Sequence, residues 1–458
     1  MGSELRPLFS WIHLSDLHFG HGDTHHRWDQ QLVLDELSQD IPQAIARFGI
    51  PAPCAVLVTG DIAFSGASRS ADEYESATAF LHSIAAATQL SPAQIFVVPG
   101  NHDVQRSADK TPAVGRLMRS LRDGNEQIDA IIDSQEERGI LAQRQANYQR
   151  FASQFAPACL THERAATLQW SHRLESAGLP VRLIGLNTAM LAADDSDKGK
   201  LRLGLSGFAS SVLKPPLSPN ELVLVLSHHP LHGGWLADES DVDGWLRKRA
   251  HVHLFGHIHS ADTESLRRGG QREFVRITAG AAHNERLPPG NPAGHGYSFG
   301  AVLAGDDGAA VLRVWPRLWT DDNREFRVDV RMLKDGQSAA DHKLGLKLLP
   351  RARQPTGSTA GSTQSAAQTD SASAHSDEAR RARLVKLLGL VLPFDSDLDM
   401  LCFTYFPDVM ARFTQGMDRT QKHLILLTSA SPTRLLTILK EYSPERFVSF
   451  ADPADREP

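Results

Sequence analysis

Five short apolar runs, each ending in residues that can bind a metal ion, constrain the fold of this chain more than any other feature. The first run, residues 9–14, leads into Asp16 and His18. The others, at 54–59, 94–99, 222–227 and 251–255, lead into Gly60-Asp61, Gly100-Asn101-His102-Asp103, His228-His229-Pro230 and Gly256-His257-Ile258-His259. Short apolar runs rich in β-branched residues are typical of buried strands. Ligands of open α/β sheets bind beyond the carboxyl ends of the strands, so we expect the five ends to converge on one site.

Segments with a helical spacing of apolar residues separate the first strands. Residues 29–48 and 71–88 show this spacing, and the alternation of strand and helix predicts right-handed crossovers in a sheet with a large parallel component. Strand-like runs resume near residues 274, 297, 310 and 326, and their alternation predicts an antiparallel second sheet. We therefore expect a first domain at 1–350.

The segment 104–180 differs from the rest of this domain. It is charged, helical in pattern and without a convincing strand, and it directly follows the Gly-Asn-His-Asp motif. Long segments at such a position carry specificity, so we predict a helical insert that caps the site. Arg116, Arg119 and Arg122 are spaced to share one helix face there, which is either a solvated face or a patch that contacts phosphate.

The composition changes after Pro350. Residues 351–376 are mostly Ser, Thr, Ala, Gly, Gln and Pro, which cannot bury enough apolar surface to offset their ordering entropy, so we predict a flexible linker. Residues 377–458 are apolar again with helical spacing, which predicts a separate small all-α bundle. Its charges are segregated into a basic group and an acidic group: Arg380, Arg381, Arg383 and Lys386, then Asp395, Asp397 and Asp399. Opposite patches favour association with a similar domain, and a bundle that only tethers or solubilises is the alternative.

Charge and cysteine content limit the classes of protein to consider. A net charge of −6 argues against a protein that coats nucleic acid through a broad basic face. The three cysteines, Cys54, Cys159 and Cys402, are far apart and suit a reducing compartment without disulfides. No signal sequence opens the chain, and no uncharged apolar run reaches the roughly 20 residues of a membrane span. We expect a cytoplasmic protein with no membrane partner.

The donors at the strand ends predict a centre with two metal ions. These donors are Asp16, His18, Asp61, Asn101, His228, His257 and His259. Mixed oxygen and nitrogen donors suit Mn, Fe or Zn better than calcium, and the lack of cysteine ligands excludes a structural zinc knot. Seven donors exceed the needs of one tetrahedral ion, whereas two ions about 3.5 to 4 Å apart that share a carboxylate account for all of them.

The order Asp-x-His, Gly-Asp, Gly-Asn-His-Asp, His-His-Pro and Gly-His-x-His resembles the calcineurin-like metallophosphoesterase superfamily over residues 9–335. The resemblance implies an α/β fold in which a two-sheet β-sandwich is flanked by helices. It implies one ion held by Asp16, His18 and His259, another held by Asn101, His228 and His257, and a bridging Asp61. His102 matches the histidine that contacts the phosphate and can protonate the leaving oxygen. Asp103 matches a position that is usually acidic, and we group it with His102 as a candidate catalytic residue.

One departure from the family bears on the substrate. Serine/threonine protein phosphatases of this superfamily continue their Gly-Asp motif with Asp-Arg-Gly, whereas Gly60-Asp61 is followed here by Ile62-Ala63-Phe64. We therefore expect a phosphodiesterase that acts on nucleotide or nucleic-acid diesters. A phosphomonoesterase and a non-catalytic scaffold that keeps the fold are the alternatives, and the intact ligand set favours catalysis.

The C-terminal bundle has a resemblance of its own. Residues 397–409 and 416–420, with the apolar segments at 424–427 and 432–436, resemble the effector-associated, death-like adaptor domains of bacterial conflict systems. The resemblance implies that 377–458 recruits a protein partner with a like domain, or a second copy of itself, in a bacterial signalling or defence system.

Overall fold

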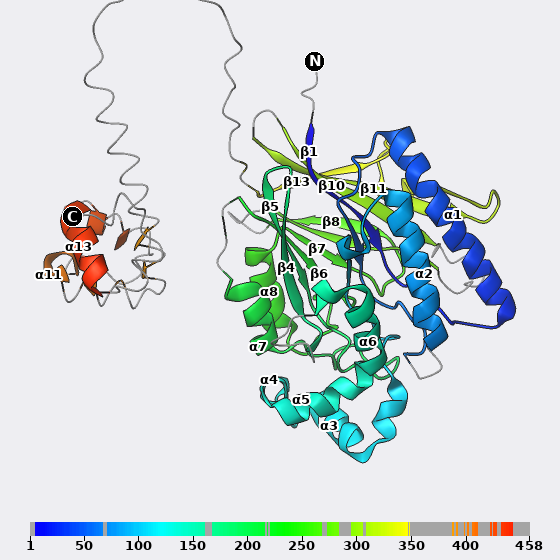
Figure 1. Ribbon diagram of the computed structural model, residues 1–458, viewed down its shortest axis with the longest axis horizontal. Helices are drawn as coiled ribbons and strands as arrows, with labels where there is room; N and C mark the ends of the chain where they lie inside the picture. The colour runs from blue at the N-terminus through cyan, green and yellow to red at the C-terminus, as the bar shows by residue number, and fades with distance from the viewer. Residues whose placement is uncertain are drawn as a thin grey trace, which may run out of the picture. The chain divides into compact units, whose positions relative to one another are not determined.

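The N-terminal apolar run forms strand β1 (Arg6–Leu14), which lies inside a seven-stranded sheet (Figure 1). The strand order is β12-β11-β10-β1-β2-β3, and β13 (Ala340–Leu344) also pairs with β11. Parallel partners follow on one side of β1, namely β2 (Ala55–Val58) and β3 (Ile95–Val97). Antiparallel partners follow on the other side, namely β10 (Gly296–Ala304), β11 (Ala310–Thr320) and β12 (Glu325–Val328).

The second sheet has six strands in the order β4-β5-β6-β7-β9-β8. Its parallel centre consists of β5 (Leu179–Gly185), β6 (Leu222–Leu226), β7 (Val252–Phe255) and β9 (Phe274–Thr278). Its antiparallel edges are β4 (Trp170–Ser176) and β8 (Asp262–Leu266). The expectation of a separate antiparallel sheet from the last strands is therefore wrong. Every residue of β10 is buried, and this strand extends the first sheet because it lies between β1 and β11.

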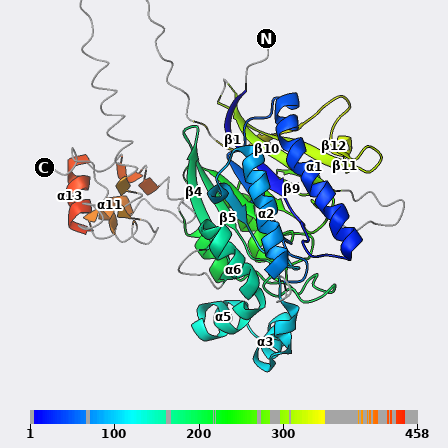
Figure 2. The ribbon, with the colours of Figure 1, turned by 45° about the vertical axis from the view of Figure 1, so that its right-hand side comes forward.

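Helices cover both sheets. Helix α1 (Thr24–Phe48) begins after Asp23, whose side chain accepts the His26 N–H, and ends at Gly49, which has a φ of 60°. Figures 1 and 2 show α1 beside α2 (Ala71–Thr88), along the first sheet. Strand β6 serves two cores: its leucines join the core that both sheets share, whereas Val223 and Val225 join a second core with α8 (Glu239–Arg249). The predicted α/β class, with two sheets flanked by helices, is confirmed.

The segment predicted as an insert contains a series of short helices. These are η3 (Arg106–Lys110), α3 (Pro112–Arg122), α4 (Ile128–Asp133), α5 (Gln135–Ala142), η4 (Gln143–Gln145), α6 (Ala146–Phe155) and η5 (Pro157–Cys159). Figures 1 and 2 show α3 and α5 together at one end of this unit. The absence of a strand before residue 181 was wrongly predicted, because β4 is an edge strand that buries only Trp170 fully and has a polar face.

Arg122 does not belong to a phosphate-contacting patch. Its guanidinium forms an ion pair with Asp197 and donates to the carbonyl oxygen of Leu191 at 2.8 Å. Only 10% of its side chain is exposed. Both alternatives for a shared arginine face are therefore wrong at this position, since Arg122 ties α3 to the loop that follows β5.

The described part of the first unit also contains the short helices η2 (Pro92–Gln94), α7 (Leu205–Phe208) and η8 (Val330–Met332). The five residues Ala209–Leu213 continue α7 as a π-helical turn, η7. Among the residues that the structure describes, none of the helices combines the length and the apolar composition that a membrane crossing requires.

The computed structural model divides the chain into two compact units, Met1–Arg353 and Gln354–Pro458. It describes residues 5–66, 71–160, 167–215, 218, 220–267, 273–283, 295–305, 308–346 and 348 of the first unit. In the second unit it describes residues 387–388, 391–392, 398, 401–402, 405–410, 422–423, 425–427 and 432–442.

The described residues of the second unit are largely helical and share an apolar core. They include α11 (Pro407–Met410) and α13 (Pro432–Tyr442), and the core contains Leu388, Leu401, Phe406, Leu426 and Leu439. The predicted linker 351–376 and the predicted charged groups lie outside the described residues: Arg380, Arg381, Arg383, Lys386, Asp395, Asp397 and Asp399.

Gly185 provides a test of how the two sheets are locked together. A Cβ atom at Gly185 would lie 2.1 Å from the indole of Trp170, its partner across β4 and β5. That indole cannot easily move, because Trp170 is buried and its Nε1 donates to the Val97 carbonyl of the first sheet at 2.9 Å. We expect Gly185→Ala to lower the free energy of unfolding by about 1–3 kcal/mol, the usual effect of overpacking.

The control for this test is Gly139→Ala. A Cβ atom at Gly139, within α5, would have no neighbour within 4 Å, so this variant should be neutral or more stable by about 0.4–1 kcal/mol. Urea denaturation of both variants measures the difference. Equal effects of the two substitutions would contradict the proposed packing of Trp170 between the sheets.

Candidate metal centre

The seven donors predicted from the sequence lie together at the ends of strands. Each of them follows the last residue of its strand by two to four positions. Asp16, His18, Asp61 and Asn101 follow strands of the first sheet, whereas His228, His257 and His259 follow strands of the second. The predicted site of convergence therefore lies where the carboxyl ends of strands from two sheets meet.

Five of the seven donors have a left-handed backbone. Their φ angles lie between 52° and 67°, in Asp16, His18, Asp61, His257 and His259. Residues other than glycine adopt this region rarely and at an energetic cost, although Asp and His tolerate it better than most. This backbone conformation turns the chain sharply, so that two side chains of one loop, such as those of His257 and His259, reach the same site.

The first group of donors consists of Asp16, His18 and His259. Their ligand atoms all lie within 4.8 Å of one another, and His259 Nε2 is 3.0 Å from Asp16 Oδ1. Asp16 is fully buried. Burial alone would raise the pKa of Asp16, but the neighbouring His259 outweighs it and holds the pKa well below its usual range. The carboxylate is therefore charged and available to a cation.

The second group surrounds the side-chain oxygen of Asn101. This Oδ1 atom lies 2.9 Å from His228 Nε2 and 3.0 Å from His257 Nδ1. His228 Nδ1 lies 2.8 Å from the carbonyl oxygen of Thr59, so it carries the hydrogen and leaves a lone pair on Nε2 in the neutral ring. Burial favours that neutral ring, but the Asp61 carboxylate outweighs it and raises the pKa of His228 to about 9 in the metal-free protein. The electron pairs that converge here suit a bound cation.

Asp61 lies between the two groups. Its Oδ2 atom is 3.3 Å from His18 Nε2 and 3.2 Å from His228 Nε2, so one carboxylate oxygen faces a histidine from each sheet. Its Oδ1 atom accepts the backbone N–H of His102 at 2.7 Å. Burial would raise the pKa of Asp61, but His228 and His102 outweigh it and hold the pKa well below the usual value. This is the position that a bridging ligand requires.

His102 lies at the edge of the first group. Its Nδ1 is 2.7 Å from the carbonyl oxygen of Phe64, so Nδ1–H donates and Nε2 carries the lone pair. The ring stacks on Phe64 with a centroid distance of 4.7 Å and lies 4.9 Å from the ring of His18. Burial lowers the pKa of His102 below its ordinary value, which favours the neutral ring in the metal-free protein.

The Asp103 carboxylate is hydrogen-bonded to the backbone of the loops that carry Asp61 and Asn101. Its carboxylate accepts the N–H groups of Gly100, Ile62 and Ala63 at 2.9, 3.2 and 3.0 Å, and the hydroxyl of Tyr74 at 3.0 Å. The side chain is fully buried. Burial, together with the charge of Asp61, raises the pKa of Asp103 to about 6. The carboxylate thus joins the loop after β2 to the loop after β3.

Two motif glycines are required by the close approach of these loops. A Cβ atom at Gly100 would lie 2.0 Å from Asp61 Oδ1. One at Gly256 would lie 1.9 Å from Ser15 Oγ and 2.7 Å from Asp16 Oδ2. Both glycines therefore allow the backbone of one strand end to touch the carboxylate of another.

Several residues beside the donors were not found from the sequence. Trp235 lies with its ring 4.4 Å from the ring of His257, and Lys198 Nζ lies 5.6 Å from the centroid of Trp235. Phe64 supports His102, as described above. An aromatic residue shortly after a ligand motif was the available signal for both Phe64 and Trp235. His229 hydrogen-bonds the hydroxyl of Thr188, and His228, not His229, contacts Asp61.

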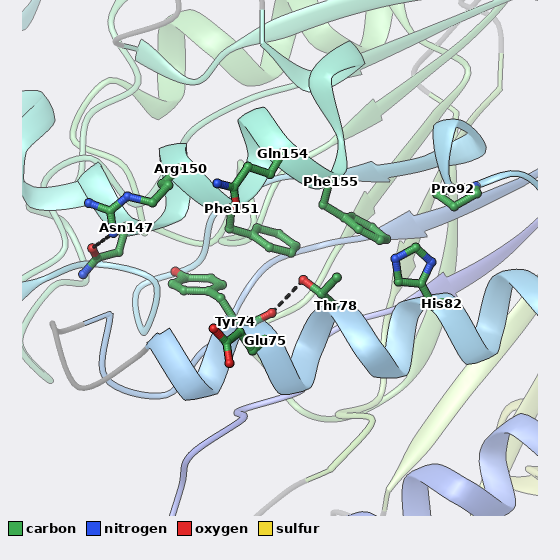
Figure 3. Close-up of a pocket in the computed structure, with 10 residues that line it drawn as sticks. All are labelled: Tyr74, Glu75, Thr78, His82, Pro92, Asn147, Arg150, Phe151, Gln154 and Phe155. Atoms are coloured by element: carbon green, nitrogen blue, oxygen red, sulfur yellow. Dashed lines mark hydrogen bonds between the residues drawn. The ribbon is translucent and has the colours of Figure 1, made fainter.

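A cavity of about 530 Å³ lies between α2 and α6 (Figure 3). None of the seven donors lines it; the lining residues are Tyr74, Glu75, Thr78, His82, Pro92, Asn147, Arg150, Phe151, Gln154 and Phe155. Tyr74 connects the cavity with the metal centre, because its hydroxyl donates to Asp103.

One curated protein is similar to part of this chain. An uncharacterized metallophosphoesterase-like protein of Bacillus subtilis (strain 168), YydB, is 23% identical over 284 residues, which are 59% of this chain and 53% of that protein. The chain thus spans about half the length of this curated relative.

Three solved structures are similar to this chain at low sequence identity. A dimetal phosphatase from Danio rerio has a TM-score of 0.35 at 13% identity, covering 65% of this chain and 96% of its own. The calcineurin-like phosphoesterase YfkN from Bacillus subtilis has a TM-score of 0.34 at 10% identity, covering 74% and 91%. A putative 5'-nucleotidase from Staphylococcus aureus has a TM-score of 0.33 at 13% identity, covering 81% and 58%.

The family profile described as calcineurin-like phosphoesterase matches residues 10–261. This match spans more than half of the chain and includes all five motifs that carry the donors. The chain therefore belongs to the calcineurin-like phosphoesterase family.

Proposed function

We propose that this protein is a phosphodiesterase that depends on two metal ions and acts on nucleotide or nucleic-acid diesters. The observation that carries the proposal is the position of the Asp61 carboxylate between two groups of donors. Asp16, His18 and His259 would hold one ion, and Asn101, His228 and His257 the other. Their mixed oxygen and nitrogen atoms suit Mn, Fe or Zn. When bound, two such ions supply Lewis-acid activation of water and neutralise charge on the phosphate.

His102 is the protein group that we assign to proton transfer. Its Nδ1–H is engaged with the Phe64 carbonyl, which leaves Nε2 as the atom that can carry a proton to the leaving oxygen. Phe64 stacks on the ring and fixes its plane. Burial favours the neutral ring, but a bound phosphate would favour the protonated one, because its negative charge stabilises the imidazolium.

Asp103, which the sequence grouped with His102, acts in this proposal as a positioning residue. Its hydrogen bonds go to the backbone around Gly100 and Ile62 and to Tyr74, not to the site where substrate would bind. It supports Asp61 and Asn101 by holding their two loops at a fixed separation.

The surroundings of Asp61 favour a diester over a monoester. Ile62, Ala63 and Phe64 stand where protein phosphatases have Asp-Arg-Gly. Ile62 and Ala63 are buried, and Phe64 stacks on His102. These three residues supply no positive charge to pair with the second negative charge of a phosphomonoester. Trp235 instead offers an aromatic ring beside His257, and such rings stack with nucleobases. Phosphomonoester hydrolysis and a non-catalytic scaffold remain the alternatives.

The helices within 104–180 form, in this proposal, a cap that selects the substrate. Helix η3 begins at Arg106, only three residues after Asp103, so the segment starts beside the metal centre. Arg144 anchors its far part, because the guanidinium donates to the carbonyl oxygens of Met190 and Ala192 at 2.7 and 2.5 Å. A cap fixed at both places would select substrates by size without supplying metal ligands.

We propose that residues 377–458 form a recruitment module, joined by a linker at 351–376, in a cytoplasmic signalling or defence system. The separate apolar core of the second unit supports an independent module. None of Cys54, Cys159 and Cys402 forms a disulfide in the structure, which suits a reducing compartment. The partner would be a similar domain, on another protein or on a second copy of this chain.

Substrate preference and metal dependence are tested together with a bis-aryl phosphate diester and an aryl monoester. Chelated protein should be inactive, and added Mn²⁺ should restore hydrolysis of the diester at a higher kcat/KM than that of the monoester. Asp61→Ala should bind less metal and remain inactive with Mn²⁺. Faster cleavage of the monoester across neutral pH would favour the phosphatase alternative, and full activity of a metal-free Asp61→Ala protein would refute the metal centre.

His102→Ala separates a proton-transfer role from a ligand role. We expect the rate to fall by about 10²- to 10⁴-fold, the usual contribution of a general acid, while the metal content stays near that of the wild type. Metal analysis beside steady-state kinetics makes the distinction. A metal-depleted His102→Ala protein would mean that this histidine is a ligand.

The recruitment module is tested by comparing the full chain with a chain that ends at Pro350. The full chain should self-associate at low salt and dissociate at high salt, whereas the shorter chain should sediment as a monomer. Both should cleave the small diester at similar rates, because the metal ligands all precede residue 260. Identical sedimentation of both chains at low salt, or a folded but inactive shorter chain, would contradict the proposal.

A further inference from the structure

A second cluster of metal-ligand side chains lies beside the first group of donors. It consists of Asp29 in α1, His283 after β9 and His295 before β10, and their ligand atoms all lie within 4.8 Å of one another. His283 Nε2 is 3.9 Å from Asp29 Oδ2. The rings of His283 and His295 are nearly parallel, with centroids 4.6 Å apart and an angle of 10°. Three segments that are distant in sequence thus bring their donors to one place.

His283 is the residue that packing does not explain. Its side chain is 1% exposed, and neither Nδ1 nor Nε2 has a hydrogen-bond partner. A neutral imidazole always carries one N–H and one lone pair, and burial of both without partners is unfavourable. A buried polar group of this kind calls for a specific reason, such as a bound ion. A cation between His283 and Asp29 would engage the lone pair.

Two further histidines, His26 and His21, lie beside the cluster. The ring of His26 lies 4.8 Å from the ring of His283, and its Nε2 is 2.9 Å from His21 Nδ1. His26 and Asp29 are three residues apart in α1, so they occupy the same helix face. His26 therefore offers a fourth donor, the third that is a nitrogen, to an ion that Asp29, His283 and His295 hold.

We propose that Asp29, His283 and His295 bind a third metal ion, separate from the pair that Asp61 bridges. One carboxylate and two imidazoles form a donor set that suits Zn²⁺, with the remaining position open to His26 or water. This ion serves structure and not hydrolysis. It ties α1 to the segments that flank β9 and β10, at the border of the active site.

The backbone of His283 links this ion to the first group of donors. The His283 N–H donates to the carbonyl oxygen of Asp16 at 3.3 Å, and the His283 carbonyl oxygen lies 3.4 Å from His18 Nδ1. Fixing the His283 side chain therefore fixes the backbone that orients Asp16 and His18. Loss of the third ion should lower the affinity of the first group for metal, but the first group keeps all its ligands and should still be filled after zinc loading.

Metal stoichiometry tests the proposal on the full chain. After the metal-free protein is loaded with Zn²⁺ and desalted, elemental analysis should find three zinc ions per chain in the wild type. Asp29→Asn and His295→Ala should each bind two, with unchanged circular dichroism. His25→Ala is the control, because His25 is an exposed histidine of the same helix outside the cluster, and it should keep three.

Asp61→Ala distinguishes this proposal from the proposed function. It should lose zinc from the paired site but keep the ion at Asp29, so that one zinc ion per chain remains at least. Two zinc ions in the wild type, with no loss in Asp29→Asn or His295→Ala, would overturn the third site and leave the paired site intact. A folded variant that keeps its zinc but binds substrate more weakly would also overturn it, and would assign the cluster to substrate.

Discussion

The proposed metal centre depends on one carboxylate, Asp61, which lies between donors that follow strands of both sheets. Asp61 follows a strand of the first sheet. Its Oδ2 atom lies 3.2 Å from Nε2 of His228, which follows a strand of the second sheet, and 3.3 Å from Nε2 of His18, which follows a strand of the first. This arrangement exists only because the carboxyl ends of both sheets meet. The core that the sheets share and the hydrogen bond from Trp170 to Val97 hold that junction in place. The geometry of the candidate metal centre therefore depends on packing well away from the seven donors.

The junction also stores backbone strain. Asp16, Asp61 and His257 are among the donors that adopt positive φ, which costs about 1–3 kcal/mol for a residue other than glycine. Hydrogen bonds from the loops to Asp103, and the close contacts that Gly100 permits, compensate for this cost. The buried carboxylates of Asp16 and Asp61 also repel each other. A bound cation offsets that repulsion, so metal binding and the folding of these loops should be coupled.

Sequence reasoning found the parts of the site that repeat a pattern and missed those that depend on tertiary contacts. The runs before Asp16 and His228 predicted strands because their apolar residues are continuous. The placement of β10 and the existence of β4 could not be predicted, since sheet neighbours and a half-polar edge strand leave no periodic signal. The burial of His283 and the turn of Asp103 toward the loop backbone were equally hidden, because both follow from contacts with distant segments.

A crystal structure of the protein loaded with Mn²⁺, with anomalous diffraction data, would show directly whether Asp61 bridges two ions. We expect two anomalous peaks about 3.5 to 4 Å apart, one on each side of the Asp61 carboxylate. The first peak should contact Asp16 and His259, and the second should contact Asn101 and His257. A single peak, or two peaks that do not share Asp61, would rule out the bridged centre.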